Sequence, residues 1–171
     1  MSLLNESCNP DRKRRKSLSL FCADFGLTEE DLGTVLRIRR RCFLIDSSNH
    51  DLLELQETLK KRKIDLFGVG VYLGEEKKVF EPSPALIELL SARTKEHKAV
   101  VDEKAEWLFL CGRDIFAKGI AEKAVSTRNG LVFVMNSQGE NLGYGKLVKE
   151  GNVAIKNILD RGFYLRRERM A

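Results

Sequence analysis

The sequence contains few of the side chains that usually carry out catalysis. Only two histidines occur in 171 residues, His50 beside an expected helix start and His97 in a hydrophilic stretch. Neither lies in apolar sequence next to a nucleophile or a carboxylate, which an acid–base or nucleophilic mechanism requires within hydrogen-bonding reach. Gly68 and Gly70 lack the spacing of a dinucleotide-binding loop, and no P-loop is present. We therefore expect no catalytic residues and no enzymatic activity.

Cysteine is also sparse, and its spacing argues against the usual zinc sites. The four cysteines stand at positions 8, 22, 42 and 111, and no two of them form a C-x-x-C pair. Structural zinc sites are commonly built from such pairs. Cys22, Cys42 and Cys111 have apolar neighbours in sequence, so we expect reduced and buried thiols, as is usual in the cytosol. The sequence therefore predicts no metal site and no cofactor.

Long apolar runs are missing as well. No segment approaches the roughly 18 consecutive apolar residues that cross a bilayer. The basic run Arg12–Lys16 follows polar residues and leads into no clean apolar segment, so it does not have the pattern of a secretory signal. We expect an intracellular, cytoplasmic protein that has no membrane partner.

Positive charge is modest in total but concentrated in sequence. The net charge is +5 and the isoelectric point is near 9.1. Basic residues cluster at Arg12–Lys16, at Arg37, Arg39, Arg40 and Arg41, and near the C-terminus. From residue 146 onward three acidic residues accompany seven basic ones: Lys146, Lys149, Lys156, Arg161, Arg166, Arg167 and Arg169. Such clustering is typical of a protein that binds a polyanion, although a solvated charged face would also produce it.

The first half of the sequence alternates helix and strand signals. Thr28 followed by three acidic residues predicts a capped helix through Leu36. Ser83 and Pro84 predict the cap and first residue of another helix. The remaining elements are a strand at 42–45, a helix at 51–59, and a hairpin of 64–73 with 78–80. The hydrophilic stretch Arg93–Lys98 suggests a boundary, which divides the chain into a basic segment 1–16, a domain 17–95 and a domain 96–171.

The second half predicts a small β-rich domain. The expected strands are 99–101, 107–111, 131–135, 142–148 and 163–169, with a short helix or turn at 114–121 and a mixed segment at 153–159. Short strands with closely spaced turns are typical of a small barrel or sandwich. In a final strand, Arg166 would point to one face and Arg167 to the other. The two can then grip one phosphate only if the strand twists or ends near Leu165.

Several motifs of the second half resemble a PUA domain, a small RNA-binding pseudo-barrel. The resemblance lies in Leu110–Gly112, Lys118–Ile120, Leu142–Gly145 and Tyr164–Glu168, within the runs WLFLCGRDIFAKG (107–119), GLVFVMNSQGENLGYG (130–145) and AIKNILDRGFYLRRE (154–168). More narrowly, the pattern is similar to the archaeal type of the Nip-seven family of large-ribosomal-subunit biogenesis factors. The likeness covers roughly residues 20–171 and is more specific in the second half.

This resemblance implies an α+β protein of two domains. The N-terminal domain would be an α/β sandwich with an antiparallel sheet and flanking helices, and the C-terminal domain a PUA pseudo-β-barrel. The family's members have no catalytic activity; they bind RNA through the PUA domain and contact assembly proteins through the N-terminal domain. We therefore expect a monomeric factor for pre-rRNA processing. Two alternatives are a protein–protein adaptor with little RNA affinity and an accessory subunit of an RNA-modification system.

The expected RNA-binding residues rest on two kinds of argument. Arg166 and Arg167 are carried over from the family because they lie inside the matched motif. Charge and position alone favour Lys146, Lys149, Lys156, Arg161 and Arg169. Tyr164 is expected to offer a ring on which a base can stack. Arginine suits such a site because its planar fork binds phosphate in two places and stacks on bases.

Overall fold

The chain folds into two compact units. The structure, a computed structural model, describes residues 17–46, 67–122 and 129–163, together with residues 54, 58, 61, 125, 127 and 166. The first unit takes its described residues from the chain up to Pro82, except for Asp24–Leu27. The second unit combines Asp24–Leu27 with the chain from Ser83 onward. The fold class is α+β, as expected, because helices accompany a sheet in each unit.

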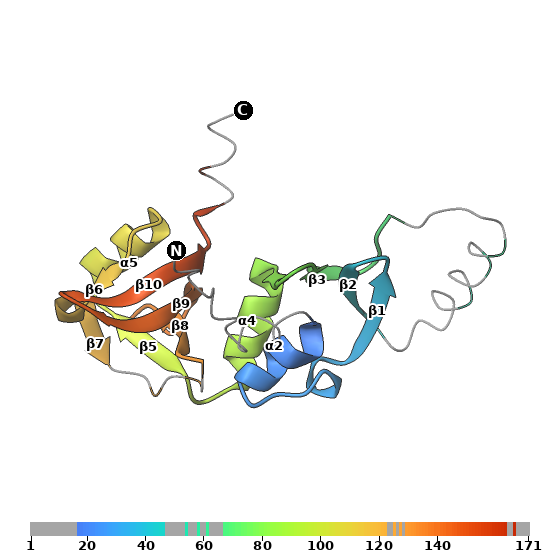
Figure 1. Cartoon of the computed structure of the whole chain (residues 1–171), viewed down its shortest axis with the longest axis horizontal. Helices are drawn as coiled ribbons and strands as arrows, with labels where there is room; N and C mark the ends of the chain where they lie inside the picture. The colour runs from blue at the N-terminus through green and yellow to red at the C-terminus, as the bar shows by residue number, and fades with distance from the viewer. Residues whose placement is uncertain are drawn as a thin grey trace, which may run out of the picture. The chain divides into compact units, whose positions relative to one another are not determined.

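The first unit contains an antiparallel sheet of four strands whose order follows the chain (Figure 1). The elements are α2 (Leu18–Asp24), the 3-10 helix η1 (Glu30–Leu32), β1 (Thr34–Ile38), β2 (Arg41–Ile45), β3 (Val71–Glu76) and β4 (Phe80–Pro82). Helix α2 buries Leu18, Phe21 and Cys22. The ring of Phe21 lies 5.4 Å from that of Phe80, which joins the helix to the last strand of the sheet.

The helix expected from Thr28 to Leu36 is wrong beyond its first turn. Thr28 does act as a cap, since its hydroxyl accepts a hydrogen bond from the Asp31 amide at 3.3 Å. The turn ends at Gly33, whose φ of 112° lies outside the helical region. Val35 and Leu36 then belong to β1, because a segment rich in β-branched residues packs well in a pleated sheet.

Other expectations for this unit are met in part. Strand β2 is confirmed, and a hairpin of β3 with β4 is present, but its strands are shifted along the chain: β3 runs from Val71 to Glu76, and β4 begins only at Phe80. Glu54, Thr58 and Lys61 are helical, while the rest of the expected helix 51–59 lies outside the described residues. The basic run Arg12–Lys16 also lies outside them.

The second unit is a strongly curved sheet with helices packed on it. Its strand order is β6 (Ile115–Phe116), β10 (Val153–Asp160), β9 (Asn141–Glu150), β8 (Leu131–Met135), β5 (Lys98–Val101) and β7 (Ile120–Glu122). The two edge strands, β6 and β7, are separated in the chain only by the 3-10 helix η2 (Ala117–Gly119). Because so short a link cannot span a flat six-stranded sheet, the sheet curls into a nearly closed barrel (Figure 1).

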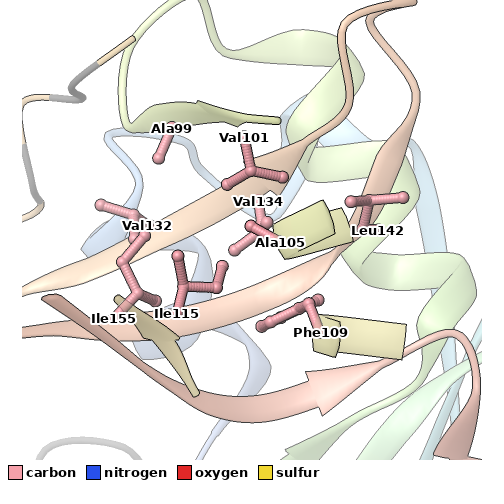
Figure 2. Close-up of a cluster of buried hydrophobic side chains, with 9 residues drawn as sticks. All are labelled: Ala99, Val101, Ala105, Phe109, Ile115, Val132, Val134, Leu142 and Ile155. Atoms are coloured by element: carbon pink, nitrogen blue, oxygen red, sulfur yellow. The ribbon is translucent and has the colours of Figure 1, made fainter. Parts of the chain in front are cut away.

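The core of this unit lies inside the curled sheet (Figure 2). Its buried members are Ala99, Val101, Ala105, Phe109, Ile115, Val132, Val134, Leu142 and Ile155. Helix α5 (Glu103–Leu110) contributes Ala105 and Phe109, which lie one turn apart and therefore on the same helix face. Phe109 is fully buried, and burial of such a ring stabilises the fold by about 2 kcal/mol.

Two strands expected in the second half are wrong. The run Trp107–Cys111 is not a strand, because α5 occupies it through Leu110: Asp102 caps this helix by accepting from the Ala105 amide at 2.8 Å, and Glu103 and Glu106 favour its positive N-terminus. The expected strand 163–169 is also wrong where the structure describes it. Phe163 and Arg166 are helical, and the Arg166 amide donates to the Gly162 carbonyl at 3.1 Å.

The helix and strands around these regions are closer to expectation. Helix α4 (Pro84–Arg93) starts at the expected cap, since the Ser83 hydroxyl accepts from the Leu86 amide at 3.1 Å. Strands β5, β8 and β9 are confirmed. The segment expected to be mixed is instead the eight-residue strand β10, and the segment 114–121 contains β6 and η2 before β7 begins.

The position of α4 moves the division of the chain. This helix belongs to the second compact unit and packs on β9, so the division between the two compact units falls between Pro82 and Ser83. The domain ranges 1–16, 17–95 and 96–171 stay predictions, because compactness alone defines the two units.

Gly143 is the tightest point in the pairing of β9 with β10. Its φ is +145°, and a Cβ atom there would lie 2.1 Å from the Leu159 carbonyl oxygen. Gly139 has a φ of +82° but open space around it. We expect Gly143→Ala to lower the free energy of unfolding of the second unit by about 3 kcal/mol, and Gly139→Ala by about 1 kcal/mol. Urea denaturation followed by the fluorescence of Trp107, the only tryptophan, measures both; equal losses would contradict this account.

The described cysteines differ in accessibility, which corrects one expectation. Cys22 and Cys42 are buried, whereas Cys111 is exposed after the end of α5. Burial raises the pKa of the Cys22 thiol to about 12 and that of Cys42 to about 11. At about pH 8 we expect iodoacetamide to modify Cys111 well before Cys22 and Cys42, because the thiolate is the reactive form. Peptide mass mapping of the native protein measures the order, and equal rates without denaturant would refute it.

Candidate nucleic-acid interface

Two lysines stand directly opposite each other on the outside of the curled sheet. Lys146 in β9 pairs with Lys156 in β10, and both side chains are exposed. Directly opposed side chains of an antiparallel pair have Cβ atoms about 5 Å apart, and like charges on directly opposed side chains disfavour the pairing. An anion that contacts both lysines would offset this effect. The structure thus brings together two of the residues that charge and position favoured.

An aromatic ring lies on the neighbouring strand of the same face. Ile115 in β6 pairs with Ile155 in β10, and both are buried in the core. Side chains alternate along strands, so Phe116 and Lys156, which follow these isoleucines, point outward. The Phe116 side chain is 44% exposed. The same outer face of β6, β10 and β9 therefore carries the lysine pair and one exposed ring, and Phe116 is paired with Val153, three residues before Lys156 on β10.

A pocket of about 260 Å³ opens next to this ring, between α5 and η2. Phe116, Leu108, Lys104 and Lys118 are among its lining residues. Gly119 makes the close packing of η2 on α5 possible, since a Cβ atom there would come within 2.7 Å of the Ala105 Cβ. The pocket thus combines an apolar floor with two lysines.

Two carboxylates also line the pocket, but both have structural hydrogen bonds. Asp102 caps α5, and Asp114 accepts from the Asn157 amide at 2.9 Å. Each therefore has one oxygen tied to the backbone. The two carboxylates thus fix the elements around the pocket.

Sequence reasoning missed Phe116 and Lys118 as site residues. Both lie in the run 107–119, which served only as a family marker. Strand β6 has two residues, too few to show an alternating pattern. The available signal was an aromatic residue two positions before a Lys–Gly pair.

Arg166 is engaged by a buried carboxylate. Its Nη1 lies 2.8 Å from Asp160 Oδ1 and its Nη2 lies 2.7 Å from Asp160 Oδ2, while Nη1 also donates to the Leu110 carbonyl. The Asp160 side chain is only 3% exposed. These hydrogen bonds raise the pKa of Arg166 above its ordinary value. The Arg166 guanidinium, which we expected to bind phosphate, thus links the end of β10 to the end of α5.

Arg161 also has a carboxylate partner, but in solvent. It forms an ion pair with Glu88 of α4, and about half of each side chain is exposed. Exposed pairs of this kind contribute about 0–1 kcal/mol, so an anionic ligand can compete for the arginine. Arg161 and Arg166 lie beyond the end of β10, four or more residues after Lys156.

The remaining predicted site residues lie outside the described part of the chain. They are Tyr164, Arg167, Arg169 and the side chain of Lys149. Within the described residues, no group of three His, Cys, Asp or Glu side chains is arranged to hold a metal ion. The helices in this part of the chain are all too short or too polar to span a membrane.

A curated protein matches about half of the chain. The "UPF0113 protein" of Archaeoglobus fulgidus is 35% identical over 86 residues, which are 45% of this chain and 49% of that protein. The chain therefore spans about half the length of this curated relative.

Solved structures give looser matches. A conserved PUA domain protein from Thermoplasma acidophilum is 23% identical with a TM-score of 0.47, covering 74% of this chain and 97% of that one. A hypothetical protein from Pyrococcus horikoshii is 24% identical with a TM-score of 0.39, covering 50% and 60%. A chain of an H/ACA ribonucleoprotein bound to a substrate RNA is 20% identical with a TM-score of 0.36, covering 65% and 33%.

The family comparison assigns the part of the chain that carries the lysine pair and Phe116. Residues 97–169 match the family model described as the UPF0113 PUA domain. This range contains β5 to β10, α5 and η2. Residues 97–169 are therefore a PUA domain.

Proposed function

We propose that this protein is a non-enzymatic RNA-binding factor whose PUA domain holds RNA on the outer face of β6, β10 and β9. The observation that carries the proposal is the opposed pair Lys146–Lys156 on the same outer face as the exposed ring of Phe116, which pairs with Val153 on β10. PUA domains commonly bind RNA, which agrees with this chemistry.

The three side chains supply the two interactions that single-stranded RNA uses most. Lysines bind the phosphate backbone and release its counterions, so affinity falls with salt and depends little on sequence. An exposed ring stacks on any base. The pocket beside Phe116, with Lys104 and Lys118 on its wall, offers room for part of a nucleotide. The cationic face of these strands can thereby bind along an RNA chain.

We also propose a role in assembly of the large ribosomal subunit, with pre-rRNA as the ligand and assembly proteins contacting the first unit. Support comes from the motifs Lys118–Ile120 and Leu142–Gly145, which are similar to the Nip-seven family. The proposal includes a monomeric protein that acts in the cytoplasm.

The lysine pair is tested by Lys146→Ala/Lys156→Ala. We expect weaker binding of a mixed A and U single-stranded RNA, with the slope of log affinity against log salt reduced by about 1.4, or about 0.7 for each phosphate contact. Titrations at several salt concentrations measure the slope. The matched control is Arg93→Ala/Lys95→Ala, which removes two exposed charges elsewhere in the same unit. An unchanged slope in the lysine variant would favour the adaptor function over RNA binding.

The ring is tested in the same assay by Phe116→Leu. We expect a loss of affinity of about five-fold or more with no change of the salt slope, because stacking involves no counterion release. A fold check by circular dichroism accompanies the titration.

Arg166 is expected to act on stability and not on RNA. Arg166→Gln leaves the buried Asp160 carboxylate without its partner and should lower the free energy of unfolding by about 2 kcal/mol, with the salt slope for RNA unchanged. Arg161→Gln, which breaks an exposed pair, should cost no more than about 1 kcal/mol. Urea denaturation and RNA titration of both variants separate the two roles. A stable Arg166→Gln protein with a lower salt slope would instead make Arg166 a phosphate ligand.

A further inference from the structure

The arginine cluster at residues 37–41 lies at one end of the first unit's sheet. Ile38 pairs with Arg41, so the β1–β2 turn consists of Arg39 and Arg40. The β3–β4 turn lies beside it, because the Glu76 amide donates to the Arg40 carbonyl at 2.7 Å. This second turn begins with two lysines, at positions 77 and 78. Two basic turns therefore adjoin at the same end of the sheet (Figure 1).

The nearby carboxylates neutralise only part of this charge. Glu75 lies 3.3 Å from the guanidinium of Arg40 and 3.1 Å from the Lys77 ammonium, so one carboxylate serves two cations. Lys77 also pairs with Glu81 at 2.7 Å. Arg40 stays 69% exposed in spite of its ion pair. An excess of positive charge remains where both turns meet solvent.

An aromatic surface begins directly at this basic end. The Arg41 guanidinium lies 4.6 Å from the centre of the Phe67 ring, and Phe67 is 81% exposed. Phe43, which follows Arg41 on the same face of β2, has its ring 5.5 Å from that of Tyr72. A Cβ atom at Gly68 would lie 3.1 Å from the Phe43 ring. The chain at Phe67 is thus packed against the face that carries Arg41 and Tyr72.

The β1–β2 turn contains one residue in an uncommon backbone conformation. Arg39 has a φ of +55°, a region in which glycine, asparagine and aspartate are the usual residues. Arg39 adopts this conformation although it is unfavourable for a residue with a side chain. Strain of this kind, when observed, is common at functional sites.

We infer that this arginine–phenylalanine face of the first unit is a second binding site for single-stranded RNA. The face comprises Arg39, Arg40, Arg41, Lys78, Phe67 and Tyr72. Phosphates would contact the two turns, and bases would stack on Phe67 and Tyr72. The inference goes beyond the proposed function, which places RNA on the PUA domain, and neither site requires the other.

The aromatic residues favour RNA over an acidic polypeptide as the occupant. Basic side chains alone would bind either RNA or an acidic polypeptide. A guanidinium lying over an exposed ring, however, presents a flat cationic surface next to a flat apolar one, and nucleotide bases stack on both. The combination of phosphate-binding turns and stacking rings matches the alternation of phosphate and base along a nucleic acid strand.

The test uses the full chain and two first-unit variants. Arg40→Ala/Lys78→Ala removes one arginine and one lysine from the turns, and Phe67→Leu removes the ring while keeping an apolar side chain. Arg93→Ala/Lys95→Ala removes the same two residue types from the second unit and serves as the matched control. Each protein is titrated with a mixed A and U single-stranded RNA at several salt concentrations and, separately, with polyglutamate.

We expect Arg40→Ala/Lys78→Ala to lower the salt slope by about 1.4 relative to the control. Phe67→Leu should weaken RNA binding about five-fold or more without a change of slope and leave polyglutamate binding unaltered. RNA affinities equal to the control would overturn the inference. Equal losses for RNA and polyglutamate in the charge variant, with no effect of Phe67→Leu, would overturn it in favour of an acidic protein ligand.

The Lys146→Ala/Lys156→Ala protein separates this inference from the proposed function. If that variant loses all RNA binding while the first-unit variants match the control, the PUA proposal stands and the second site fails. If it binds RNA as the control does and Arg40→Ala/Lys78→Ala removes the binding, the second site stands and the PUA proposal fails.

Discussion

Close contact between β9 and β10, which requires glycine at two positions, holds the second unit together. At Gly143 and Gly145 a Cβ atom would meet the carbonyl oxygens of Leu159 and Lys156 at 2.1 and 2.5 Å. The same pairing carries Ile155 into the core and sets Lys156 opposite Lys146. It also ends at Asp160, which binds Arg166. The close pairing of β9 with β10 therefore determines the packing of the core, the position of the two lysines and the attachment of the chain that follows Asp160.

The two units present cations in different ways. In the PUA domain, lysines oppose each other across a strand pair, and an exposed ring on the same outer face comes from a third strand. In the first unit, the cations gather in turns, and a guanidinium covers the exposed ring. Arginine and lysine are used according to their chemistry, since the planar guanidinium stacks whereas the ammonium acts as a compact charge. Buried Asp160 shows the contrasting use, in which an arginine stabilises the fold.

Local signals predicted the elements whose ends are marked in sequence. Ser83 with Pro84 marks the start of α4, and the continuous apolar run Leu131–Met135 is a fully buried strand. We expected a strand at Trp107 because a short apolar segment shows neither a clear helical nor a clear strand periodicity. The cap at Asp102 is the feature that distinguishes a helix from a strand here. Charge favoured Lys146 and Lys156 as RNA-binding residues, which stays a prediction, but it did not indicate their register. Sequence alone could not predict that Arg166 binds Asp160 and the Leu110 carbonyl, because tertiary packing brings these groups together.

The short link η2 leaves the sheet of the second unit with two short edge strands. It places β6 and β7 at the two edges of the curled sheet, and these strands have only two and three residues. Exposed strand edges are the usual template for pairing between neighbouring chains, and short edges offer few unpaired backbone groups. The sheet of one copy of this domain therefore offers little template for pairing with the sheet of another copy.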